Sequence, residues 1–146
     1  MRAGRSAAAL IADASTTPIR IRFGPTTLTG SLDASPAALA LRARLPVTAE
    51  FTDFGGVEKT APVAALPMAG MPAGADPGPG TVGYYAPDQV LVLYHGNVGY
   101  FPGIADLGRF DDPENVVADA DGPVTASPPP RWNRRWSTTT GWPRRR

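Results

Sequence analysis

The sequence predicts a mainly β protein whose strands form a closed or nearly closed antiparallel barrel with two short helices. Seven short segments have the apolar pattern of strands and are separated by turn residues, whereas only two segments begin as helices do. The chain also holds 16 glycines and 17 prolines in 146 residues, roughly double their usual share, which favours strands, turns and loops. Many short strands with few helices are typical of a barrel.

The first two strands form a predicted hairpin. Residues 18–23 alternate apolar side chains with arginine, which is the period of two expected for a half-buried strand. Gly24 and Pro25 mark a turn, and residues 26–32 return with leucines that share one face.

A helix of about ten residues is predicted to follow this hairpin. Ser35 is placed to accept backbone N–H bonds as the N-cap, Pro36 suits the first helical position, and Pro46 ends the helix. Apolar residues at helical spacing would pack one face against the sheet: Ala38, Leu41 and Leu45. Residues 47–51 then alternate as a third strand, which a turn at residues 53–56 ends.

The second half of the chain begins with a long predicted loop and continues with four short strands. Eight of the fourteen residues from 67 to 80 are Gly or Pro, so they cannot join a sheet regularly. The predicted strands are residues 81–85, 90–94, 98–101 and 107–110, with a hairpin around Gly96 and Asn97. The unbroken apolar run at 90–94 indicates a strand buried on both faces. Asp112 is the predicted N-cap of a short closing helix over residues 115–120.

A single domain is predicted, with an extension at each end. Residues 18–120 would form the barrel, residues 1–17 a flexible N-terminal extension, and residues 121–146 a disordered basic tail. Six arginines lie in the last 16 residues, and since the whole chain carries +1, the remainder carries −5. No apolar run approaches the ~20 residues of a membrane helix, and the apolar stretch near the start is too short for a signal peptide. We therefore expect a soluble, cytoplasmic protein.

Motifs that resemble cofactor-binding or catalytic signatures stand in the wrong context. GPGTVG at residues 78–83 has the dinucleotide-binding spacing, but a loop precedes it and a strand follows it where a helix is required. DFG at residues 53–55 lacks the other kinase motifs and indicates a hairpin-type turn. With one histidine and no cysteine, the chain predicts neither a catalytic triad nor a Cys-based metal site. We expect no metal and no cofactor.

Three charged features each have two interpretations. His95 follows an apolar strand beside a turn, so we interpret it as a polar turn residue rather than a proton-transfer group. Lys59 follows the turn at Gly55 and Gly56 and is interpreted as a solvated surface cation, with a place at the rim of a cleft as the alternative. The basic tail, with its three tryptophans, has the charge and stacking groups for nucleic acid or an anionic surface, but a solvated extension is the preferred interpretation.

Several segments resemble the bacterial cyclophilin-like domain family. They are GTVGYYAPDQVLVLYHG, PGIADLGRFDDPENV, IRIRFGPTTLTGSL, the helix that ends in LP, and EFTDFGGVEK, in the order and spacing of the family over about residues 18–118. The resemblance implies a cyclophilin-like antiparallel β-barrel of about eight strands, with a helix at each open end.

The resemblance also implies a binding surface on the face of the barrel. In cyclophilins proper this face holds a proline-containing peptide in a hydrophobic pocket, and an arginine assists rotation about the X–Pro bond. QVLVL is similar to the strand that supplies a glutamine and an aromatic residue, so Gln89 and Leu91 would take those positions and Tyr85 would border them. The segment that carries the arginine has no match, and the closest basic residue is Lys59, which lacks the planar fork of arginine.

Three hypotheses of function follow. In the first, the domain binds a small molecule or peptide segment in a pocket on the barrel face, at Lys59, Tyr85, Gln89 and Leu91, without known catalysis. In the second, it is a divergent peptidyl-prolyl cis-trans isomerase that uses Tyr85, Gln89 and Lys59. In the third, the basic tail associates with nucleic acid or an anionic surface. No catalytic residue and no oligomeric state are assigned.

Overall fold

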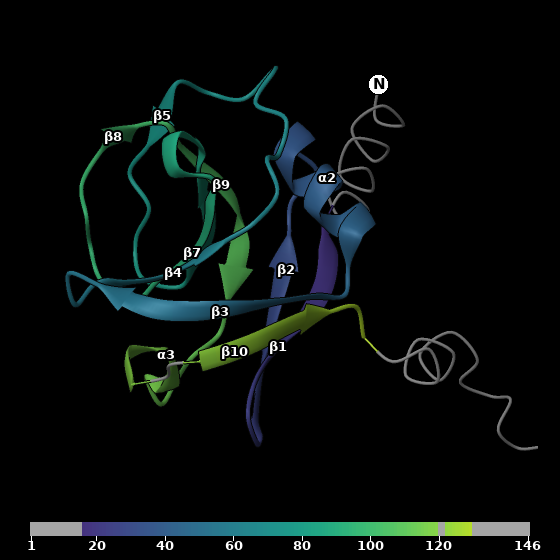
Figure 1. Cartoon of the computed structure of the whole chain (residues 1–146), viewed down its shortest axis with the longest axis vertical. Helices are drawn as coiled ribbons and strands as arrows, with labels where there is room; N and C mark the ends of the chain where they lie inside the picture. The colour runs from purple at the N-terminus through teal and green to yellow at the C-terminus, as the bar shows by residue number, and fades with distance from the viewer. Residues whose placement is uncertain (1–15, 120–121, 130–146) are drawn as a thin grey trace, which may run out of the picture.

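Eight strands form a closed antiparallel barrel in a computed structural model that describes residues 16–119 and 122–129 (Figure 1). Around the barrel their order is β1-β10-β3-β4-β7-β6-β9-β2. The bounds are β1 Thr17–Phe23, β2 Thr26–Leu32, β3 Val47–Phe54, β4 Glu58–Pro62, β6 Thr81–Tyr85, β7 Val90–Tyr94, β9 Ile104–Phe110 and β10 Gly122–Ser127. Two shorter strands, β5 Gly74–Ala75 and β8 Phe101–Pro102, pair with each other in a separate small sheet. The predicted fold class is confirmed.

Apolar side chains from alternate positions of the strands fill the barrel, and a helix covers each end. Helix α2, Pro36–Arg44, connects β2 to β3 and buries Ala37, Ala38 and Leu41 against the core at one end. Helix α3, Val116–Asp119, connects β9 to β10 at the other end and contributes Val117. The strands supply Ile19, Ile21, Phe23, Leu28, Leu32, Phe51, Ala61, Val82, Tyr84, Leu91, Leu93, Ala105, Leu107, Phe110 and Val124. All eight barrel strands therefore meet in one core.

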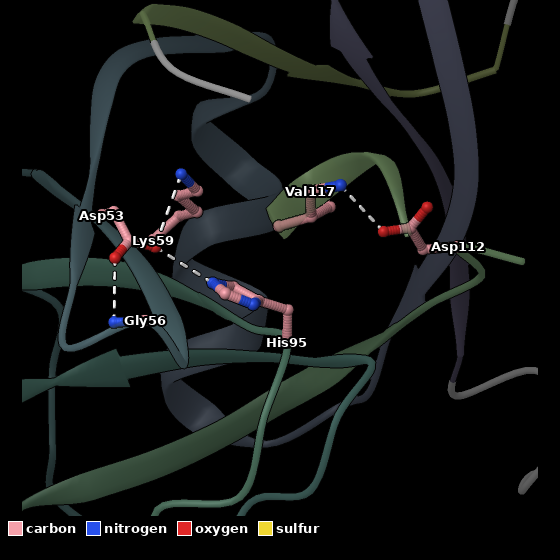
Figure 2. Close-up of polar contacts among 6 residues, drawn as sticks. All are labelled: Asp53, Gly56, Lys59, His95, Asp112 and Val117. Carbon is pink, nitrogen blue, oxygen red and sulfur yellow. Dashed lines mark hydrogen bonds and ion pairs between the residues drawn. The ribbon is translucent and has the colours of Figure 1, made fainter. Parts of the chain in front are cut away.

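Of the two predicted helix caps, the structure confirms one. The Asp112 carboxylate accepts the backbone N–H groups of Val116 and Val117 at 2.7 and 2.9 Å, so its side chain caps α3 as predicted, although the helix begins at Val116 rather than directly after Asp112. Figure 2 shows the bond to Val117. Ser35 lies at the N-cap of α2 but makes no side-chain capping bond. Its hydroxyl donates instead to the Asp33 carboxylate at 2.7 Å, because that acceptor lies two residues before it.

Strand β10 corrects the predicted end of the domain. The sequence assigned residues 121–146 to a disordered tail, but residues 122–127 pair with β1 on one side and with β3 on the other. Both neighbours would otherwise present unpaired backbone N–H and C=O groups. A weakly apolar segment is therefore ordered by the two sheet edges that it closes, with Val124 facing the core.

The region between β7 and β9 also differs from the prediction. A hairpin around Gly96 and Asn97 was expected, but residues 95–100 form a loop and β8 pairs with β5. The backbone N–H groups of His95 and Gly96 both donate to the carbonyl of Val57, at 2.8 and 3.0 Å, which turns the chain toward the β3–β4 turn. The strand predicted at residues 107–110 is longer in the structure, because β9 begins at Ile104. The long loop predicted over residues 67–80 is present and contains only the short strand β5.

Parts of the two predicted extensions, residues 1–15 and 130–146, lie outside the described residues, as do residues 120–121. In the part of the chain that is described, no helix is long and apolar enough to cross a membrane.

Gly108 in β9 offers a test of the barrel register. Its Cα pairs with Leu32 of β2, and a Cβ placed there would overlap the backbone carbonyl oxygen of Ser31. We expect Gly108→Ala to lower the free energy of unfolding by about 2–3 kcal/mol, because backbone cannot move aside as a side chain can. The melting temperature, measured by circular dichroism, should fall by roughly 10 °C.

Gly78→Ala is the matched control for this substitution. A Cβ at Gly78 would meet only the Asn97 side chain, at 3.9 Å. If Gly78→Ala lowered the free energy of unfolding as much as Gly108→Ala, the steric explanation would be contradicted.

Candidate functional site

A cavity of about 420 Å³ lies on the outer face of the barrel, over β4, β7 and the adjoining ends of β6 and β9. We call it the outer groove. Its lining residues are Phe54, Glu58, Thr60, Tyr85, Asp88, Val90, Tyr94, Val98, Phe101 and Ile104. Four of the ten are aromatic and two are carboxylates.

Strand β7 separates the outer groove from the barrel core. Leu91 and Leu93 point into the core, whereas Val92 and Tyr94 belong to a second apolar cluster on the outer face. That cluster also includes Ile104, with Ala75, Tyr85, Val90 and Val98 packed against it. Since Ala75 belongs to β5, the small β5–β8 sheet helps to cover the outer face (Figure 1). The predicted burial of residues 90–94 on both faces is confirmed.

Tyr94 forms part of the groove wall because the neighbouring strand has a glycine beside it. A Cβ on Gly83 would lie 2.7 Å from Cε2 of the Tyr94 ring, so the ring occupies the space that a side chain would take. Tyr94 is 1% exposed. Within the described residues its hydroxyl makes no hydrogen bond with another protein group. Burial, followed by the nearby Glu58 and Asp106 carboxylates, raises the pKa of Tyr94 above its ordinary range, so the phenol stays protonated.

The two carboxylates of the outer groove lie toward opposite ends of β7. Glu58 pairs across the strands with Tyr94, whereas Asp88 stands just before Val90 in the 3-10 turn η1, Ala86–Asp88. Burial, and then repulsion from the Asp53 carboxylate, raises the pKa of Glu58 above its ordinary value. No described residue forms an ion pair or hydrogen bond with the Glu58 carboxylate. The groove is therefore apolar along its length and negative toward both ends.

The four residues that the sequence proposed for binding do not form one site. Tyr85 lines the outer groove. Leu91 points into the barrel core, and Lys59, in β4, is buried beside Ala61 on the inner face. Gln89 is exposed and adopts the left-handed conformation (φ 54°) that ends η1.

Four of the groove residues that sequence reasoning missed are immediate neighbours of residues that it proposed. Glu58 and Thr60 flank Lys59, and Asp88 and Val90 flank Gln89. Because consecutive strand residues face opposite sides, a shift of one position changes the face. The alternation of Glu58, Lys59 and Thr60 would have separated the two faces, had this segment been identified as a strand.

A polar cluster closes the end of the barrel that faces α3 (Figure 2). The Lys59 ammonium lies 3.4 Å from Asp53 Oδ1, and His95 Nε2 lies 3.2 Å from the same oxygen. Asp53 Oδ2 accepts the Gly56 N–H at 2.8 Å, which confirms the predicted turn at DFG. Lys59 is only 2% exposed, so its interpretation as a solvated surface cation is wrong. Its buried ammonium is paired with the Asp53 carboxylate, whose side chain is 38% exposed at the barrel end.

The charge of Asp53 is stabilised by its surroundings. Burial alone would raise its pKa, but the Gly56 N–H, the His95 ring and the Lys59 ammonium together lower the pKa below its ordinary value. Among residues 16–119 and 122–129, no group of three or more acidic or histidine side chains could hold a metal ion. The Asp53 cluster thus joins β3, the β3–β4 turn, β4 and the loop after β7, and it lies on the opposite face of the sheet from the outer groove.

The fold and the groove together define a class: a small closed β-barrel domain with a concavity on its outer face. A family model described as the cyclophilin-like family matches residues 21–127. The chain therefore belongs to the cyclophilin-like family. The matched range includes β10, in agreement with its place in the barrel.

Among solved structures, the chain is similar to the solution structure of a hypothetical protein from Archaeoglobus fulgidus. The two share 19% sequence identity, and the match covers 78% of this chain and 95% of that one with a TM-score of 0.57. At this identity the likeness shows the fold alone. A search of curated proteins found no match.

Removal of the Asp53 charge tests the role of the polar cluster. Because the pKa of Asp53 lies below its ordinary value, the charged form stabilises the fold above about pH 4, and this stabilisation is lost as the pH falls through the lowered pKa. Asp53→Asn should therefore lower the melting temperature at pH 7, and the difference from the unmodified protein should shrink toward pH 3. Thermal unfolding at the two pH values measures both effects.

Glu50→Gln, at an exposed position of β3, serves as the control and should change little at either pH. An Asp53→Asn deficit that is equally large at pH 3 would show that packing rather than charge explains the loss.

Proposed function

We propose that this domain binds a small molecule or a short peptide segment in the outer groove. The supporting observation is the cavity of about 420 Å³, which falls within the ~300–1,000 Å³ range of ligand pockets. Its lining combines aromatic walls with a few polar groups, which is the usual composition of such pockets.

The exposure of the groove rim also supports binding. Phe54 is 64% exposed and Phe101 is 51% exposed, although both are large apolar side chains. Phe101 lies with its ring centre 6.0 Å from that of Tyr85, so the two rings form one side of the concavity. A ligand in the groove would remove these faces from water, which favours binding.

The isomerase hypothesis receives less support from the arrangement of the side chains. Rotation about an X–Pro bond has a barrier of ~20 kcal/mol and needs a polar contact at the amide. Lys59 lies on the inner face of β4, away from Tyr85, and no Lys, Arg or His among the described residues lines the groove. Rate enhancement in a prolyl isomerisation assay that Tyr85→Ala abolishes would replace binding by catalysis as the function.

Blocking the outer groove tests the proposal. In a nuclear magnetic resonance screen of a small-molecule fragment library and short proline-containing peptides, we expect binders to shift the backbone amide signals of Val90, Tyr94, Val98 and Ile104. Thr60→Trp should abolish these shifts, because the indole would fill the cavity that Thr60 lines.

Thr29→Trp, at an exposed position of β2, is the control and should leave the shifts in place. Shifts that map elsewhere, or that persist in folded Thr60→Trp, would contradict the proposal. If Thr60→Trp does not fold, the proposal is judged by whether binders shift the amide signals of the groove residues in the unmodified protein.

A further inference from the structure

We propose that the outer groove is a site for an organic cation, namely an ammonium or guanidinium group carried on an apolar body. This inference rests on the proposed function and adds to it the chemistry of the ligand. Three features of the groove point to a positive ligand.

The first feature is a carboxylate that lacks a counter-charge. Glu58 is partly buried in the groove wall, and no described residue forms an ion pair or hydrogen bond with it. Burial, followed by repulsion from the Asp53 carboxylate, raises the pKa of Glu58. The Lys59 ammonium, on the next residue, faces the barrel interior and lies 3.4 Å from Asp53. A partly buried carboxylate in this situation is stabilised by a cation that comes from outside the described fold.

The second feature is the Tyr94 hydroxyl. Tyr94 is 1% exposed and lines the groove, and its hydroxyl has no hydrogen-bond partner among the described residues. Buried polar groups are nearly always hydrogen-bonded, so a buried hydroxyl without a protein partner is expected to bind a ligand or an ordered water. Burial, followed by the nearby Glu58 and Asp106 carboxylates, raises the pKa of Tyr94, so its hydroxyl stays protonated. A phenol oxygen can accept a hydrogen bond from an N–H donor.

The third feature is the aromatic lining. The rings of Phe54, Tyr85, Tyr94 and Phe101 all border the cavity. Aromatic faces attract ammonium and guanidinium groups through the ring quadrupole, most strongly where water is excluded. With Glu58 and Asp88 as the charged lining groups, the groove combines the two elements that bind alkylated amines.

The separation of the two carboxylates along β7 indicates where the cation and the apolar body of the ligand would lie. Glu58 lies opposite Tyr94, and Asp88 stands two residues before Val90. From Val90 to Tyr94 the strand rises by four residues, or about 13 Å. A cation held at Glu58 therefore leaves the rest of the apolar groove for the body of the ligand.

The test uses three probes of similar size that differ in charge: benzylammonium, benzyl alcohol and benzoate. Titrations followed by amide chemical shifts of the full chain give a dissociation constant for each. We expect benzylammonium to bind on the order of tenfold more tightly than benzyl alcohol, and benzoate to bind least. Glu58→Gln should reduce the preference for the cation toward unity, whereas Glu50→Gln, outside the groove, should retain it.

The outcomes separate this inference from the proposed function. Equal binding of benzylammonium and benzyl alcohol in the groove would overturn the preference for cations and leave the proposed binding function in place. A preference that Glu58→Gln does not reduce would also overturn it. If neither these probes nor the fragments and peptides of the earlier screen shift groove residues, the proposed function itself fails.

A further probe and a further variant identify the source of the cation. N-acetyl-arginine methylamide represents an arginine side chain of a peptide, and benzylammonium represents a free amine. In a full-length variant, the six arginines of residues 131–146 are replaced by glutamine. Tighter benzylammonium binding in that variant would show that this segment competes for the groove. That result would support the cation site and identify an arginine of residues 131–146 as the cation.

Discussion

Strand β7 carries apolar side chains on both faces, and each face needs its own cover. The barrel core covers Leu91 and Leu93, while Val92 and Tyr94 depend on the segments around β5 and β8. Leaving the outer face in water would forfeit the free energy of burying this second cluster. The long excursions between β4 and β6 and between β7 and β9 provide the cover. Because this cover is incomplete, part of the outer face remains open as the groove.

The elements that could be predicted from the sequence are those with a strong local pattern. In β1 the alternation of isoleucine and arginine marks the strand, and the prolines around α2 mark the helix ends. Strand β10 has little local signal, since Val124 is its single large apolar residue and its order comes from two distant strands. Strand β4 is similar, because Glu58 and Lys59 do not suggest a strand until their partners are known. A strand whose own sequence alternates apolar and polar residues can be predicted locally. Strands without that pattern, such as β4 and β10, form because distant strands pair with them.

The candidate site shows the same limit more sharply. A run such as VLVLY has apolar residues at every position, so its two faces cannot be distinguished from the sequence. The resemblance of QVLVL to the cyclophilin strand placed Leu91 on the binding surface, but the structure places its neighbour Val90 there. Lys59 goes against the usual preference of lysine for water because Asp53 is carried to the same barrel end by the β3–β4 turn. The positions of Leu91 and Lys59 both depend on contacts between separate segments, and the burial preference of a single residue type does not predict such contacts.

The close approach of Tyr94 to Gly83 has a consequence for how this surface could change over time. A single methyl group at Gly83 would lie 2.7 Å from the Tyr94 ring, so the ring would have to move and the shape of the groove would change. Such a change would replace none of the charged residues that line the groove. The shape of the concavity and its charge therefore depend on different strands, with Gly83 in β6 and Glu58 in β4, which lie on opposite sides of β7.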